Sequence, residues 1–155
     1  MEEENQQVDL YGNLNNNNMN NKKKISFDFD GTLVDEFGGH PSNSQKDEVQ
    51  GLAKKYLSEG HDVIIITKRF GPEKSYKGIK NEHLEVQELA KKLGIEKVYF
   101  TNREMKFSYI INLGVDRHFE NDDYEVQLIN QVCKEKGHEC LVIPVEDNNW
   151  RDLLK

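Results

Sequence analysis

The chain has little cysteine, no long apolar run and no excess of positive charge, and each shortage excludes a class of protein. Only two of its 155 residues are cysteines, Cys133 and Cys140, and they lack CxxC spacing, so neither a disulfide framework nor a zinc site is expected. No apolar run approaches the roughly 18 residues that cross a bilayer, and no signal-peptide core opens the sequence. We therefore expect a cytoplasmic protein with no membrane contact.

The formal net charge of −7 argues against a protein that coats nucleic acid. The first 21 residues combine an acidic start with an asparagine run over 15–18 and contain few apolar side chains. Such a segment cannot bury enough apolar surface to fold by itself. We predict a disordered, Asn-rich tail over residues 1–21 and a single folded domain over residues 22–155.

Short apolar runs alternate with amphipathic stretches through the predicted domain. The apolar runs predict strands at about 24–29, 61–67, 97–100, 117–119 and 139–145. The amphipathic stretches predict helices at about 44–59, 80–93, 103–113 and 123–136, with a last short one near 149–153. This alternation is typical of an α/β fold in which helices cover both faces of a five-stranded parallel sheet. Ligands of such sheets bind beyond the carboxyl ends of the strands.

The most informative segment, residues 25–35, follows the first apolar run with two aspartates one residue apart. Side chains at i and i+2 of a strand share a face, so Asp28 and Asp30 are expected to point into one pocket. Gly31 then permits a turn. Two carboxylates this close repel each other unless a cation or a shared proton relieves them. The pair predicts a Mg²⁺ site with one carboxylate free to act as a nucleophile.

Residues 28–32, Asp-Phe-Asp-Gly-Thr, resemble the first motif of the haloacid dehalogenase (HAD) superfamily of phosphatases and phosphotransferases. The resemblance implies a Rossmann-like core with Asp28 as the nucleophile that forms an aspartyl-phosphate and Asp30 as the general acid and base. It also implies Mg²⁺ bound by Asp28, by the backbone carbonyl of Asp30 and by a later acidic residue. Gly31 and Thr32 are expected to contact the substrate.

Two further residues match later motifs of this family. Thr67 ends the second apolar run, where its hydroxyl could donate a hydrogen bond to a phosphoryl oxygen. The family also has a lysine that neutralises the nucleophile and the transferring phosphoryl group, as a carboxylate-rich site requires. Lys106 is the preferred candidate because its helix directly precedes the fourth strand, and Arg103 is the alternative.

The fourth motif is less regular, because the fourth strand is followed by a Glu-Asn pair before two aspartates. Asp122 is the preferred metal ligand and Glu120 is expected to assist it. Either Asp122 or Asp123 could instead cap the helix at 123–136, where a carboxylate suits the positive end of the helix dipole. His118 is expected to have a core or surface role rather than a catalytic one.

The spacing of these residues leaves no room for a cap domain over the site. Only 13 residues separate Asp30 from Ser44, the predicted N-cap of the first helix. The 38 residues between Thr67 and Lys106 are mostly used by a core helix and strand. We expect a capless protein with an open site, so that water must be excluded by the substrate or by a second subunit.

Two observations bear on the substrate. The chain from the fourth motif to Gly137-His138-Glu139-Cys140 and the last strand is loosely similar to the 3′-phosphatase domain of polynucleotide kinases. Residues 68–80 hold five bases and one acid at the predicted mouth of the site, where Lys68 and Arg69 are best placed to contact a second phosphate. An ordinary solvated loop would also explain this segment.

The sequence therefore predicts a Mg²⁺-dependent phosphohydrolase that acts on a nucleotide or polynucleotide-end phosphate through Asp28. It is expected to be a monomer or a weak homodimer. One alternative is a phosphatase for small metabolites with a lid from a second subunit. The other is a non-catalytic binding protein built on the same fold.

Overall fold

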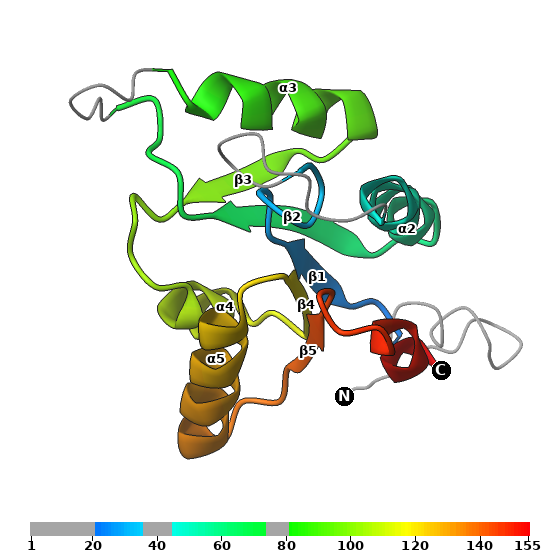
Figure 1. Ribbon diagram of the computed structural model, residues 1–155, viewed down its shortest axis with the longest axis vertical. Helices are drawn as coiled ribbons and strands as arrows, with labels where there is room; N and C mark the ends of the chain where they lie inside the picture. The colour runs from blue at the N-terminus through cyan, green and yellow to red at the C-terminus, as the bar shows by residue number, and fades with distance from the viewer. Residues whose placement is uncertain (1–20, 36–44, 74–80) are drawn as a thin grey trace, which may run out of the picture.

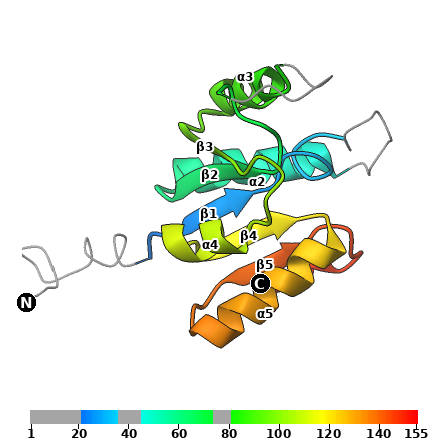
Figure 2. The same ribbon diagram turned by 90° about the vertical axis from the view of Figure 1, so that its left-hand side faces the viewer.

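The computed structural model describes residues 21–35, 45–73 and 81–155 and contains one five-stranded sheet (Figure 1). Its strands are β1 (Lys24–Phe27), β2 (Asp62–Thr67), β3 (Lys97–Phe100), β4 (Arg117–Glu120) and β5 (Leu141–Pro144). All pairings are parallel, in the order β3-β2-β1-β4-β5, and the arrows of β1, β4 and β5 point the same way in Figure 2. The predicted α/β fold with five parallel strands is confirmed.

Helices cover both faces of the sheet, as predicted. They are α2 (Lys46–Ser58), α3 (His83–Leu93), α4 (Phe107–Leu113), α5 (Asp123–Lys136) and the short 3-10 helix η1 (Trp150–Leu154). Residues of α2, α3 and η1 share one apolar cluster, and residues of α4 and α5 share the other. Figure 1 shows α4 and α5 together on one side of the sheet and α2 with η1 on the other.

The strand sequences explain why the sheet is buried on both faces. The apolar run of β2 sends Val63 and Ile65 to one cluster and Ile64 and Ile66 to the other. Alternate side chains of a strand point to opposite faces, so a run without alternation suits a strand covered on both sides. Phe27 of β1 packs on the α2 side, so its neighbour Ser26 faces the opposite side of the sheet.

The strand order also fixes where a site can form. The chain begins at the centre of the sheet with β1, builds one edge through β2 and β3, and then crosses back to place β4 on the other side of β1. The order of strands therefore reverses between β1 and β4. In open α/β sheets, the crevice at the carboxyl ends of such strands is the usual ligand site.

Several predicted boundaries differ from those of the structure by two to four residues, and two of them have clear local reasons. The helix expected from residue 103 begins at Phe107, because Asn102 and Arg103 adopt φ of 56° and 72°, far from the helical value of about −63°. The first strand ends at Phe27 rather than near residue 29, because the carbonyl of Phe29 already accepts turn hydrogen bonds from Leu33 N and Val34 N. Asp28 and Asp30 therefore lie in the turn that follows the strand.

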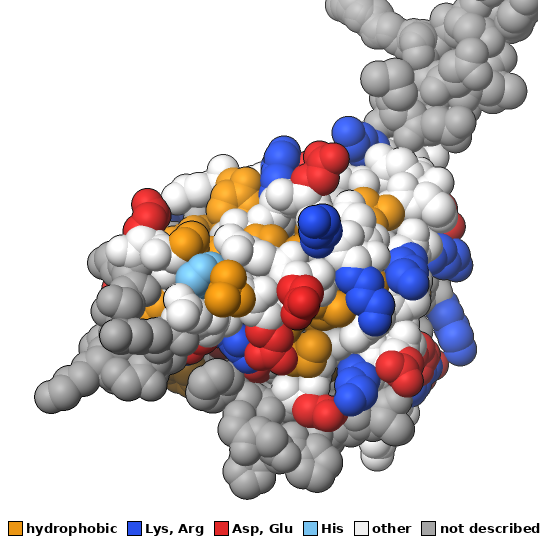
Figure 3. Space-filling model, turned by 90° about the horizontal axis from the view of Figure 1, so that it is seen from above, with side chains coloured by type: hydrophobic (Ala, Val, Ile, Leu, Met, Phe, Trp, Pro, Cys, Tyr) orange, Lys and Arg blue, Asp and Glu red, His pale blue; other side chains and the backbone are white. Residues whose placement is uncertain are grey.

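Every described helix and strand belongs to this layered core, so the described ranges contain no cap domain. The tail over residues 1–20, the predicted N-cap Ser44 and residues 74–80 of the basic segment lie outside the described residues. Acidic and basic side chains are interspersed on the face seen in Figure 3, which is typical of a solvated helix surface. Among the helices of the described ranges, none is long and apolar enough to cross a membrane.

Candidate active site

The loops at the carboxyl ends of the strands line an open pocket of about 540 Å³. Its lining combines six carboxylates, two lysines and an amide that follow β1, β2, β4 and β5 or precede α4. These residues are Asp28, Asp30, Lys68, Lys106, Glu120, Asn121, Asp122, Asp123 and Glu146. The pocket lies at the predicted edge of the sheet, and it brings together residues up to 118 positions apart, from Asp28 to Glu146 (146 minus 28).

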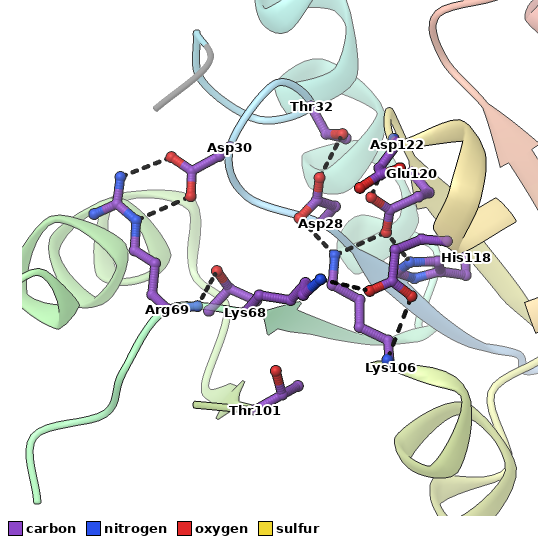
Figure 4. Close-up of polar contacts among 12 residues, drawn as sticks. Asp28, Asp30, Thr32, Lys68, Arg69, Thr101, Lys106, His118, Glu120 and Asp122 are labelled. Atoms are coloured by element: carbon purple, nitrogen blue, oxygen red, sulfur yellow. Dashed lines mark hydrogen bonds and ion pairs between the residues drawn. The ribbon is translucent and has the colours of Figure 1, made fainter. Parts of the chain in front are cut away.

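Asp28 is the most deeply placed carboxylate contributed by the first motif. Its side chain is only 8% exposed, and its backbone N–H is fixed by a hydrogen bond to Phe119 O of the neighbouring strand. Oδ1 accepts a hydrogen bond from Lys106 Nζ at 2.7 Å, and Oδ2 accepts a longer one from Thr32 Oγ1 at 3.3 Å (Figure 4). Asp28 is thereby held in one orientation at the bottom of the pocket.

Lys106 places a single buried ammonium group between two carboxylates. It precedes α4, where its carbonyl accepts the first helical hydrogen bond from Ile110 N, and its side chain is 1% exposed. Nζ lies 2.7 Å from Asp28 Oδ1 and 2.7 Å from Glu120 Oε1. Burial opposes the charge of Lys106, but the two carboxylates outweigh it and raise the pKa of the ammonium group.

The two carboxylates that share this ammonium group have opposite pKa shifts. Burial, and then the charge of Glu120, raise the pKa of Asp28 well above its usual range. Burial would also raise the pKa of Glu120, but Lys106 and His118 lower it to about 2. One ammonium group cannot neutralise two buried carboxylates completely, so a second positive charge near Asp28 would stabilise its ionised form.

The acidic residues of the fourth motif divide into two kinds. Glu120, at the end of β4, is 1% exposed and bonds to Lys106 and His118. Asp122 is exposed, and its Oδ1 accepts a hydrogen bond from Tyr124 N, which caps α5. Asp123 is the first residue of that helix and also lines the pocket. The capping role left open by the sequence therefore belongs to Asp122.

Asp30 also lines the pocket, but its carboxylate is bound by another cation. Arg69 donates to both carboxylate oxygens, from Nε at 3.0 Å and from Nη2 at 2.7 Å. The guanidinium group is fixed in turn by Glu82 O at 2.7 Å and Glu85 Oε1 at 3.0 Å, and it lies 4.8 Å from the ring centroid of Phe29. Arg69 is 5% exposed, so the structure places it as a clamp on Asp30 rather than at the pocket wall.

Arg103, the alternative candidate to Lys106, does not reach Asp28. Its guanidinium group pairs with Glu82 at 2.9 and 3.1 Å and lies over the ring of Phe70 at 4.5 Å. Of the two cations that the sequence suggested for the nucleophile, the structure brings only Lys106 to it.

The two residues contributed by the end of β2 differ in exposure. Thr67 is 1% exposed, and its hydroxyl accepts a hydrogen bond from Arg69 N at 3.3 Å, so it lies behind the pocket lining. Lys68 does line the pocket, with a side chain 35% exposed. Its Nζ lies 3.5 Å from Glu125 Oε2 and 3.7 Å from Met105 Sδ.

Gly31 allows the first-motif turn and the loop after β4 to approach closely. Its φ is +80°, in the region that favours glycine, and a Cβ at this position would lie 2.2 Å from Asn121 Nδ2. A side chain on residue 31 would therefore displace Asn121, which lines the pocket beside Glu120. The predicted role of Gly31 in contacting substrate is not tested by this geometry.

Sequence reasoning missed three residues of this region: Asn121, Glu125 and Glu146. Glu125, in the first turn of α5, is fully buried and accepts a hydrogen bond from Lys106 N at 3.3 Å. An acidic residue in the first turn of a helix ordinarily suits the dipole at the surface, so its type gave no sign of burial. The position of Glu146 just past the last strand was the available signal, since strand ends converge in a parallel sheet.

The donor set suits a Mg²⁺ ion at the pocket. Among the described residues, no three His, Cys, Asp or Glu side chains converge closely enough to hold a metal by themselves. Mg²⁺ commonly binds through one or two carboxylates plus waters and substrate phosphate, so such a cage is not required. The residues that would hold the ion are Asp28, the Asp30 carbonyl and Asp122, the last through Oδ2, because its Oδ1 caps α5.

No protein-family model matches this chain, and no curated protein matches its sequence. Interpretation of the site therefore depends on its geometry and on the motif at residues 28–32.

Proposed function

We propose that this protein is a Mg²⁺-dependent phosphohydrolase that works through an aspartyl-phosphate on Asp28. The observation that carries the proposal is the buried Lys106 ammonium group, bonded at 2.7 Å to both Asp28 and Glu120 at the floor of an acid-lined pocket. A fixed, lysine-paired carboxylate at a strand end is suited to nucleophilic attack on phosphorus. The resemblance of residues 28–32 to the HAD first motif supports the same chemistry.

In the first half-reaction, a carboxylate oxygen of Asp28 attacks the phosphorus of the substrate. The bond from phosphorus to the leaving oxygen breaks, and that oxygen takes a proton from Asp30. Lys106 stabilises the negative charge on the transferring group from below. Bound Mg²⁺ would neutralise the phosphoryl oxygens and orient them for in-line attack.

In the second half-reaction, Asp30 removes a proton from a water molecule, which attacks the phosphorus of the acyl phosphate. The bond between phosphorus and Asp28 breaks, inorganic phosphate leaves, and both aspartates return to their starting states. Asp30 can perform these transfers only after its carboxyl group leaves the Arg69 fork, so we infer that substrate binding is coupled to that movement.

A nucleotide or a polynucleotide end is the substrate class that we propose. The pocket is open, and Lys68 at its wall is partly exposed and able to contact a second phosphate. Arg69 is less suited to this role, because its donors contact Asp30, Glu82 and Glu85 within the protein.

The same Arg69 fork favours a second candidate, a non-catalytic protein that binds phosphorylated ligands. A carboxyl group whose two oxygens both contact a buried guanidinium is occupied within the protein and is poorly placed to exchange a proton with a substrate. The two candidates differ in whether phosphate is released.

The deciding experiment measures phosphate release from 3′- and 5′-phosphorylated oligonucleotides, mononucleotides, sugar phosphates and an aryl phosphate, with Mg²⁺ and with EDTA. We expect phosphate release with Mg²⁺ and none with EDTA. The Asp28→Asn variant should release no phosphate, whereas the control Asp152→Asn, at an exposed aspartate of η1, should release as much as wild type. A hydroxylamine-sensitive phosphoryl group on Asp28 would identify the intermediate. Full activity in Asp28→Asn would exclude the mechanism, and binding without release would favour the second candidate.

A further inference from the structure

A chain of buried hydrogen bonds extends from the floor of the pocket into the core between β1 and β4. Ser26 Oγ lies 2.6 Å from His118 Nδ1, and His118 Nε2 lies 2.9 Å from Glu120 Oε1. The same Glu120 oxygen accepts the hydrogen bond from Lys106 Nζ that leads to Asp28. Figure 4 shows His118 behind Glu120, on the side away from Asp28.

The polar members of this chain occupy a face of the sheet that is otherwise apolar. Ser26 and His118 are register partners on β1 and β4, and both are fully buried. Ile110 and Ile129 belong to the apolar cluster on the same side of the sheet. A polar group without a partner is destabilising in such surroundings, so the hydrogen bonds of Ser26 and His118 are what make these two residues compatible with this face.

The partners of His118 determine which ring nitrogen carries the proton. Glu120 Oε1 lies 2.7 Å from the buried Lys106 ammonium group, and a carboxylate oxygen paired in this way accepts hydrogen bonds. Nε2 must therefore carry a hydrogen. The Ser26 hydroxyl, 2.6 Å from Nδ1, can act as a donor, so a single ring hydrogen on Nε2 satisfies both partners and Nδ1 needs none. Nδ1 then accepts from the Ser26 hydroxyl, which leaves every polar group of the chain with a matching partner.

We propose that His118 is a positioning residue: by donating from Nε2 to Glu120 Oε1, it fixes the carboxylate that holds Lys106 against Asp28. Glu120 has three rotatable side-chain bonds, and within the described ranges its Oε2 accepts only one long hydrogen bond, of 3.3 Å, from Asp122 N. The donor on its inner side therefore decides where Oε1 lies. Ser26 contributes one step further away, by holding His118 in the required tautomer.

An alternative explanation is that His118 only fills space in the core. That explanation predicts that any side chain of similar volume will serve, whereas positioning requires a donor at the place of Nε2. Glutamine can place an amide N–H near that position, and leucine fills much of the volume without a donor.

The kinetic test, which rests on the proposed function, compares His118→Gln with His118→Leu on an aryl phosphate in Mg²⁺. Loss of an outer hydrogen-bond partner at a metal site typically lowers activity about 10–100-fold, so we expect kcat of the leucine variant to fall by that factor. KM should change much less, because His118 does not reach the pocket. The glutamine variant should recover most of the loss. Equal losses in both variants, or no loss in either, would overturn the proposal.

A second test does not depend on activity. Long-range ¹H–¹⁵N NMR of the wild-type protein reports which imidazole nitrogen is protonated, and we expect the Nε2–H tautomer for His118 at neutral pH. An Nδ1–H tautomer or a doubly protonated ring would overturn the proposal even if the enzyme is active. A wild-type protein that hydrolyses nothing, with His118 as the Nε2–H tautomer, would instead refute the proposed function and leave the positioning of Glu120 supported.

Discussion

Two charged clusters flank the first-motif turn, and they treat its two aspartates differently. In the Lys106 cluster, Asp28 shares one fully buried lysine with Glu120, and water has almost no access. In the Arg69 cluster, Asp30 is 24% exposed and occupies both arms of a guanidinium fork. The first cluster has two carboxyl groups for one ammonium group at the floor of the pocket, whereas in the second one guanidinium group contacts both oxygens of Asp30.

The difference teaches that one short motif can supply two carboxylates with separate physical roles. Two buried carboxyl groups that share one cation are suited to bind a metal ion, because the ion supplies the second positive charge. They are also suited to react with a phosphate, because attack by Asp28 removes its negative charge. A forked pair holds a loop in place and changes only when a competing partner arrives. Mutations that remove these two cations should therefore destabilise the protein to different extents. The first two of four predictions test this difference, and the other two concern residues beside the Lys106 cluster.

The largest effect is expected from Lys106→Met. It leaves Asp28 and Glu120 buried without a cation, and loss of one partner from a buried ion pair costs about 3–5 kcal/mol in free energy of unfolding. Urea denaturation in EDTA measures the loss. Lys68→Met is the matched control, because that lysine lines the same pocket but is 35% exposed, and it should cost less than about 1 kcal/mol. Similar losses in the two variants would contradict the distinction.

Arg69→Met should have a smaller effect than Lys106→Met. It removes the two bonds to Asp30 and the bond to Glu82 O, but the partly exposed Asp30 can be hydrated after the change. We expect a loss of about 2 kcal/mol, the scale of hydrogen bonds to charged groups. Arg69→Lys should recover little, since an ammonium group cannot form the fork. If Arg69→Met lowers the free energy of unfolding as much as Lys106→Met does, then water does not hydrate Asp30 after the change, and the two clusters do not differ as described.

The sequence predicted the fold and the Lys106 cluster better than the Arg69 cluster. Asp28 was found because residues 28–32 resemble the HAD first motif. That resemblance implies a lysine, and Lys106 was preferred because its helix directly precedes the fourth strand. The fork between Asp30 and Arg69 was missed, although both residues were named, because no local pattern tells which cation a carboxylate will meet 39 positions away. Pairing of this kind depends on how the turns after β1 and β2 pack.

Burial was the other property that local pattern could not supply. Glu125 was indistinguishable from a solvated residue at a helix start, yet it is fully buried beneath Lys106. For His118 the sequence left a core or a surface role open; it is fully buried, and its bond to Glu120 depends on the register of β1 and β4. Side-chain partners across strands follow from register, which a single sequence does not specify.

The third prediction concerns the contact between the turn after β1 and the loop after β4, where Gly31 lies against Asn121. Gly31→Ala keeps residue 31 in the left-handed backbone conformation, which costs a residue with a Cβ about 1–2 kcal/mol. The new Cβ also collides with Asn121. Gly60→Ala is the matched control, because Gly60 has φ of +88° and nothing within 4 Å of its Cβ position. Thermal unfolding should show a larger loss for Gly31→Ala than for Gly60→Ala. Adding Asn121→Ala should remove that excess, and an excess that persists would place the strain elsewhere.

The smallest effect is expected at Glu125, which supports the Lys106 cluster from α5. Burial raises the pKa of Glu125, so the folded protein binds a proton here more tightly than the unfolded chain does. Stability from this residue is present below the ordinary pKa of 4.5 and is lost as pH rises. Glu125→Gln removes the penalty and can still accept the hydrogen bond from Lys106 N. It should therefore raise the free energy of unfolding at pH 7, by up to about 1 kcal/mol.

The pH dependence of Glu125→Gln separates this explanation from a simple change in packing. Its advantage over wild type in EDTA should fade as pH falls below about 4.5, where wild-type Glu125 is protonated. Glu48→Gln supplies the opposite sign, because the hydrogen bonds from Arg151 lower the pKa of Glu48. That variant should be less stable than wild type at pH 7, and its deficit should also fade on acidification. An advantage of Glu125→Gln that is constant with pH would show that it comes from packing and not from the ionisation of Glu125, whereas no advantage at pH 7 would show that Lys68, 3.5 Å away, already neutralises Glu125.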